Sequence, residues 1–105
     1  MVEYFYNANG DAIPTSYVED GVYEYKGTTL DGDSVYHISY HDKQRQKHIS
    51  YDTVEVRGRH YYIHGSGHER NDASGQISRW DPQYTNRVTW YEALGRRTDG
   101  LIDLR

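Results

Sequence analysis

The sequence contains no cysteine, which excludes disulfide bonds, thiolate metal ligands and a cysteine nucleophile. It also has no apolar run that approaches the roughly 18 residues of a membrane span. The first residues lack the basic stretch and apolar run of an export signal. We therefore expect a chain that makes no membrane contact and works in a reducing compartment, either the cytoplasm of a bacterium or infected host cell or a virion.

Large aliphatic side chains are also scarce, because Leu, Ile, Val and Phe together number 18 of the 105 residues. So low a content is typical of disordered chains. The 12 Tyr and 2 Trp compensate, since each can bury a large ring and keep its polar tip hydrogen-bonded. The length matches one ordinary domain, so we expect residues 1–105 to form a single domain with a modest core.

The net charge of −4 is too small to indicate a nucleic-acid binder, but the charges are unevenly distributed. Residues 1–42 contain eight acids and one base, a net charge of −7, and the remaining residues carry +3. Such asymmetry predicts either an acidic and a basic surface or two halves of a sheet that attract each other.

Glycine, asparagine and aspartate interrupt the chain at short intervals, which is typical of an antiparallel β meander. Between these breaks lie segments rich in β-branched and aromatic residues, which we predict to be strands: 2–6, 22–28, 34–41, 47–56 and 60–64. The fold class is therefore mainly β, a small antiparallel β-barrel or strongly curved sheet of about five to six strands with one short C-terminal α-helix. The helix is expected over 82–94, because Asp81-Pro82 resembles a helix start and apolar residues then recur at helical spacing.

Two further features concern the connections. The apolar residues of 47–56 change parity after Tyr51, which predicts a β-bulge or corner near Asp52-Thr53. Residues 65–79 contain almost no apolar side chains, and we expect a long loop there, with a function of its own.

Three sets of residues are candidate functional sites. His37 and His41, like His60 and His64, lie four residues apart in predicted strands, so each pair shares a face and can supply metal ligands. A second set, His37, Glu55, Arg57 and His64, provides the general base, general acid and cation that metal-free RNA cleavage requires. In this respect the composition is similar to that of small microbial ribonucleases. Tyrosine rings flanked by Asp, Asn and His leave a carbohydrate-binding module as a further alternative.

The third set combines aromatic and basic residues, the mixture that is enriched at protein interfaces. It consists of Arg57, Arg59, Tyr61, Tyr62, His68, Arg70 and Trp80. The same mixture also binds single-stranded nucleic acid, but the net acidity favours a protein partner. The prediction is a non-catalytic protein–protein interaction module without a cofactor, of the kind found as bacteriophage or bacterial accessory proteins: a virion connector or tail component, or an inhibitor of a host protein. A homo-oligomer is compatible with it.

Overall fold

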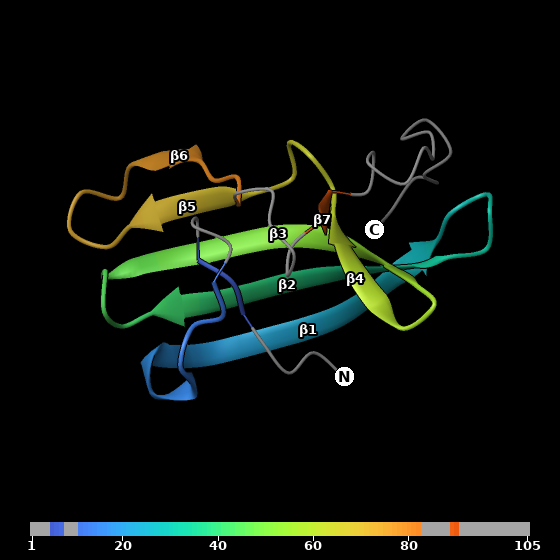
Figure 1. The fold of residues 1–105 in the computed structure, drawn as a ribbon. Helices are drawn as coiled ribbons and strands as arrows, with labels where there is room; N and C mark the ends of the chain where they lie inside the picture. Colours follow the sequence, from blue (N-terminus) through green and yellow to red (C-terminus); the bar gives the residue numbers. More distant parts are fainter. Residues whose placement is uncertain (1–4, 8–10, 83–88, 91–105) are drawn as a thin grey trace.

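The fold consists almost entirely of β-strands in the computed structural model, which describes residues 5–7, 11–82 and 89–90 (Figure 1). A short 3-10 helix, η1 (Thr15–Tyr17), precedes the first strand. The strands are β1 (Val18–Thr28), β2 (Ser34–Asp42), β3 (Lys47–Val56), β4 (Arg59–Tyr62), β5 (His68–Asn71), β6 (Ile77–Arg79) and β7 (Thr89–Trp90). The prediction of a mainly β chain is confirmed. No helix in these ranges is long and apolar enough to cross a membrane.

All the strands belong to one open sheet. Strands β1 to β4 follow one another in chain order, β7 pairs in parallel with β4, and the other pairings are antiparallel. The sheet branches at β3, which pairs with β4 through its second half and with β5 through its first half. Strand β6 then pairs with β5 alone. The sequence also allowed a closed barrel, and this alternative is wrong. In the described part of the chain, β1 and β6 each pair with a strand on one side only.

The central strands lie where the sequence placed them, and the two-residue turn between β3 and β4 shows one reason. Arg57 and Gly58 both have positive φ, 53° and 82°, which is the conformation that a tight hairpin between β3 and β4 requires. Strand β1 begins at Val18, four residues before its predicted start at Val22. The strand expected over 2–6 falls mostly outside the described residues, within which Tyr6 forms an isolated bridge to Ala12.

The segment 65–79 is a hairpin rather than a loop. Its strands β5 and β6 are polar, so they offer no apolar alternation for a sequence pattern to detect. Backbone pairing with β3 holds β5, at Lys47↔Asn71 and Ser50↔His68, and β6 pairs in turn with β5. Tertiary context has therefore imposed strand structure on a segment with little intrinsic preference for it.

The helix predicted over 82–94 lies largely outside the described residues. The two residues of that range that the structure describes beyond Pro82 are Thr89 and Trp90, and they form β7, not a helix. The parallel pairing of Tyr62 with Trp90 requires an extended backbone at that point.

The parity change in β3 has a different cause from the one expected. Pairing between β2 and β3 runs without interruption from Ser34↔Glu55 to Asp42↔Lys47, so there is no bulge near Asp52-Thr53. Instead the sheet buries apolar side chains on both faces. One cluster consists of Ile13, Ile38, Tyr40, Ile49, Tyr51, Tyr62 and Trp80, and the other of Val35, Val54, Val56 and Ile63.

Candidate binding surface

Three tyrosines and a histidine gather on one face of the sheet, near the β1–β2 and β3–β4 turns. Tyr23 and Tyr25 come from β1, Tyr36 from β2 and His60 from β4, and we call them the tyrosine–histidine cluster. The Tyr23 and Tyr36 rings meet edge to face with centroids 4.6 Å apart, and Tyr25 packs on the other side of Tyr36 at 5.8 Å. These are favourable geometries for aromatic pairs, so the rings hold one another in fixed positions.

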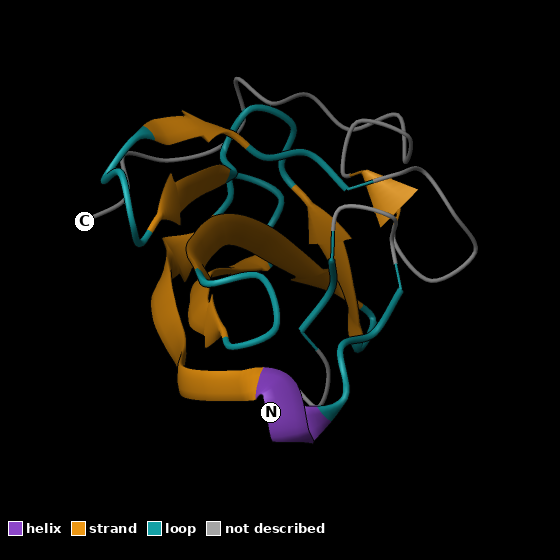
Figure 2. Cartoon of the chain, turned by 90° about the vertical axis from the view of Figure 1, so that its left-hand side faces the viewer, coloured by secondary structure: helices purple, strands orange, loops and turns teal. Residues whose placement is uncertain are grey.

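The cluster also shows how strongly the sheet curves. Two strands separate β1 from β4, yet the Tyr23 hydroxyl lies 2.7 Å from His60 Nε2 and the two rings are 5.4 Å apart. Such a contact requires the face that carries these rings to be concave. Figure 2, viewed along the strands, shows that the sheet is curved.

The environments of His60 and Tyr23 both favour the uncharged side chain at neutral pH. Desolvation by burial lowers the pKa of His60. Desolvation, the neighbouring Tyr36 and Glu55 together raise the pKa of Tyr23 to about 12. Because Thr53 Oγ1 lies 2.9 Å from His60 Nδ1, the neutral imidazole has one hydrogen bond at each nitrogen. This arrangement orients side chains; it does not prepare them for proton transfer.

The cluster is flanked by exposed apolar and basic side chains. Tyr25 is 56% exposed and Leu30, in the β1–β2 turn, is 72% exposed. The pairing Ser34↔Glu55 brings that turn to the same end of the sheet as the β3–β4 turn, where Arg57 and Arg59 are exposed (Figure 1). We call these residues together the hairpin-end surface: Tyr23, Tyr25, Leu30, Tyr36, Arg57 and His60.

The structure divides the set of binding residues that the sequence predicted. Arg57 belongs to the hairpin-end surface, whereas Arg59 pairs with Val56 and points to the opposite face of the sheet. Tyr62 and Trp80 do not line a contact surface, since each is only 2% exposed and both pack in the core around Tyr51. Their place in the predicted set needs correction: burying two large rings replaces the aliphatic core that the chain lacks.

The remaining three predicted residues lie elsewhere. Tyr61 is half-buried and packs against the second hydrophobic cluster, which contains Val54 and Ile63. His68 and Arg70 are exposed on β5, which pairs with the opposite half of β3 from the β3–β4 turn. The predicted set is therefore not one contiguous patch.

The residues proposed for RNA cleavage do not converge. His37 pairs across the strands with Asp52 and lies 2.7 Å from its carboxylate. Glu55 is three residues from Asp52 on β3, so its side chain points to the opposite face of the sheet. His64 is engaged elsewhere, since its Nε2 lies 2.9 Å from Arg79. General acid and base chemistry requires these groups in one cleft, and the fold separates them.

The four histidines proposed as metal ligands are divided in the same way. His37 and His41 share one face of β2, whereas His60 pairs with Glu55 and lies on the concave face. His41 is held between carboxylates, Asp72 at 2.6 Å from Nε2 and Glu19 at 3.1 Å from Nδ1. Among the described residues, no group of three or more His, Asp or Glu side chains is placed to hold a metal ion.

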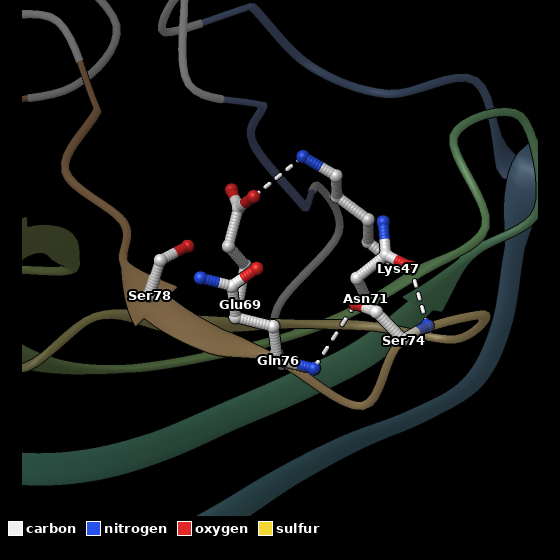
Figure 3. Close-up of a pocket in the computed structure, with 6 residues that line it drawn as sticks. All are labelled: Lys47, Glu69, Asn71, Ser74, Gln76 and Ser78. Atoms are coloured by element: carbon white, nitrogen blue, oxygen red, sulfur yellow. Dashed lines mark hydrogen bonds and ion pairs between the residues drawn. The ribbon is translucent and has the colours of Figure 1, made fainter.

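One hollow lies on the β5–β6 hairpin (Figure 3). Its volume is about 190 Å³, and its lining is entirely polar: Lys47, Glu69, Asn71, Ser74, Gln76 and Ser78. The volume is below the roughly 300–1,000 Å³ of most ligand pockets. Lys47 Nζ donates to Glu69 Oε2 at 2.5 Å, so the charged pair is satisfied within the hollow. We interpret it as a concavity of the hairpin.

Comparison of the chain with protein-family models, with curated proteins and with solved structures finds no match in any of the three.

Sequence analysis missed Tyr23, Tyr25 and Tyr36 as surface residues, although a signal was present. Tyr23 and Tyr25 alternate in one predicted strand, and Tyr36 alternates with Ile38 in the next, so the pattern indicates that the tyrosines of each strand share a face. What it could not show is that the core ends partway along each strand. Ile38 is 2% exposed, whereas Tyr25 at the next row of the sheet is 56% exposed.

Proposed function

We propose that this chain is a non-catalytic protein-binding module that contacts its partner through the hairpin-end surface. The observation that supports the proposal most directly is Tyr25, a ring that is 56% exposed and yet held in place. Its hydroxyl lies 2.9 Å from Thr28 Oγ1 and its ring packs on Tyr36. A large aromatic side chain that is already ordered loses little entropy on binding, and such residues dominate the energetics of protein interfaces.

The composition of the surface supports a protein partner as well. Tyrosine and arginine are enriched at interface centres, and here Tyr25 and Leu30 lie at the same end of the sheet as the exposed Arg57. The neutral His60–Tyr23 pair favours recognition over catalysis, because desolvation lowers the pKa of His60 and raises the pKa of Tyr23, and both shifts favour the uncharged group.

The proposal is tested with peptides selected from a random display library for binding to the folded chain. Affinities are then measured for the wild type and for Tyr25→Ala and Leu30→Ser. We expect the selected peptides to lose about tenfold or more in affinity with Tyr25→Ala, the loss typical of an interface hot spot.

The matched control is Ile77→Ser. Ile77 is 65% exposed, close to the value for Leu30, but it lies on β6, away from the hairpin-end surface. Peptides that lose affinity with Ile77→Ser, and keep it with Tyr25→Ala and Leu30→Ser, would contradict the proposal.

A further inference from the structure

Strand β1 lies at an edge of the sheet, and a short part of it is regular enough to accept another strand. It pairs with β2 on one side, and the structure describes no strand on its other side. Register shifts occur between Glu19 and Val22 and between Tyr25 and Gly27. Such irregularities discourage strand addition, so the segment open to it is Val22–Tyr25, where pairing with β2 is continuous.

Side chains of this segment divide between the two faces of the sheet. Tyr23 and Tyr25 point to the concave face, within the hairpin-end surface. Val22, which is 45% exposed, and Glu24, which is exposed, point to the other face. A strand added along β1 would place one row of its side chains beside the two tyrosines and the other row beside Val22 and Glu24.

The charge of β1 selects among occupants. The strand carries three acids, Glu19, Asp20 and Glu24, against Lys26, whose Nζ is 3.5 Å from Glu24. A second copy of the chain added through its own β1 would bring acidic strands together, and like charges on neighbouring strands are destabilising. A basic segment would instead gain from the same charges.

We propose that the partner presents an extended segment in which apolar and basic side chains alternate, and that this segment adds to β1 as a further antiparallel or parallel strand. Its apolar row lies beside Tyr23 and Tyr25, and its basic row lies beside Glu24. This inference rests on the proposed function and specifies the partner of the same surface.

The backbone contacts are tested with a blocked peptide of about seven residues that alternates valine and lysine. Two derivatives carry N-methyl groups, one on every valine amide and the other on every lysine amide. In an added strand, alternate amides face β1 and the rest face solvent. We therefore expect one derivative to lose about tenfold or more in affinity and the other to bind as the parent does. Equal loss in both derivatives, or in neither, would overturn strand addition.

The charge contacts are tested with Glu24→Lys. We expect weaker binding of the lysine peptide by about fivefold or more at low salt, and a gain for the equivalent glutamate peptide. The double variant Gln76→Lys with Ser78→Lys changes the net charge by the same amount, but at β6, which lies at the opposite edge of the sheet from β1. It should leave the affinities of both peptides nearly unchanged. An equal effect of both variants would show attraction by net charge alone and would overturn the assignment to β1.

Failure of this inference and failure of the proposed function give different results. If library-selected peptides depend on Tyr25 but neither N-methyl series nor Glu24→Lys discriminates, the surface binds protein by another mode. If Tyr25 has no influence on any selected peptide, the proposed function itself is wrong.

Discussion

At the scale of single residues, His41 is a titratable group that lies between two carboxylates. Both ring nitrogens lie within hydrogen-bond distance of carboxylates, those of Asp72 and Glu19, so the protonated ring can donate to both. The Asp72 hydrogen bond is the largest of the effects that raise the pKa of His41 above its ordinary value. The histidine thereby ties β1 and β2 to the turn between β5 and β6.

The stability that His41 contributes should depend on pH. Its pKa is higher in the folded than in the unfolded chain, so the contribution is complete below the unfolded value, about 6.5, and is lost as pH rises through the folded value. We expect the difference in unfolding free energy between wild type and His41→Gln to shrink from pH 6 upward. Urea titrations at several pH values measure it, and the His41 ring signals in an NMR titration report the pKa directly.

Asp72→Asn provides the control for that measurement. It keeps the shape of the side chain but removes the stronger partner, and the pKa of His41 should fall toward its ordinary value. His48, whose pKa is lowered mainly by desolvation, has the opposite pH dependence, so the His41→Gln difference is needed to separate the two. An unchanged His41 pKa in Asp72→Asn would contradict the proposed effect of the Asp72 carboxylate on the pKa of His41.

At the scale of elements, the polar β5–β6 hairpin is anchored by a close approach rather than by apolar burial. The Tyr62 hydroxyl lies 2.6 Å from Asp81 Oδ1 and 3.0 Å from the Trp80 carbonyl oxygen, and it accepts a hydrogen bond from the Gly67 amide. A methyl group at Gly67 would lie 2.1 Å from the Trp80 oxygen and 2.8 Å from the Tyr62 hydroxyl. The backbone can therefore approach so closely only where there is no side chain.

Gly67→Ala should destabilise the chain by about 2–4 kcal/mol, because backbone at both ends of the hairpin would have to move. Gly75→Ala, in the β5–β6 turn, is the comparison: a Cβ there meets nothing within 4 Å, and the cost comes only from its φ of 71°. Thermal unfolding of both variants gives the two values. Equal losses would show that the approach at Gly67 is not tight.

At the scale of the whole molecule, the hydrogen bond between Tyr23 and His60 joins two strands that are not neighbours and so fixes the curvature of the sheet. We expect Tyr23→Phe to lower the unfolding free energy by about 1 kcal/mol, the usual net contribution of a partly buried hydrogen bond. Denaturation in urea measures the change.

Tyr25→Phe is the matched control, because the hydroxyl that it removes bonds to Thr28 in an exposed position. Its effect on stability should be within about 0.5 kcal/mol. A loss as large as that of Tyr23→Phe would mean that curvature does not depend on the contact between β1 and β4.

The sequence by itself determined the class of fold and the positions of the central strands. The reason is local: β-branched and aromatic residues fill β2 and β3, and turn residues such as Arg57-Gly58 define the connections. The polar strands β5 and β6 carry no such local signal, because β5 forms by pairing with β3 and β6 by pairing with β5.

Only the tertiary structure decided which tyrosines are core and which are surface. Tyr62 and Tyr25 have similar strand contexts, but one is 2% and the other 56% exposed. The difference comes from long-range packing: Trp80 covers Tyr62, whereas Tyr25 lies beyond the covered part of the concave face. Opposite placement of His37 and Glu55 was decided in the same way, by strand register, which depends on partners distant in the chain.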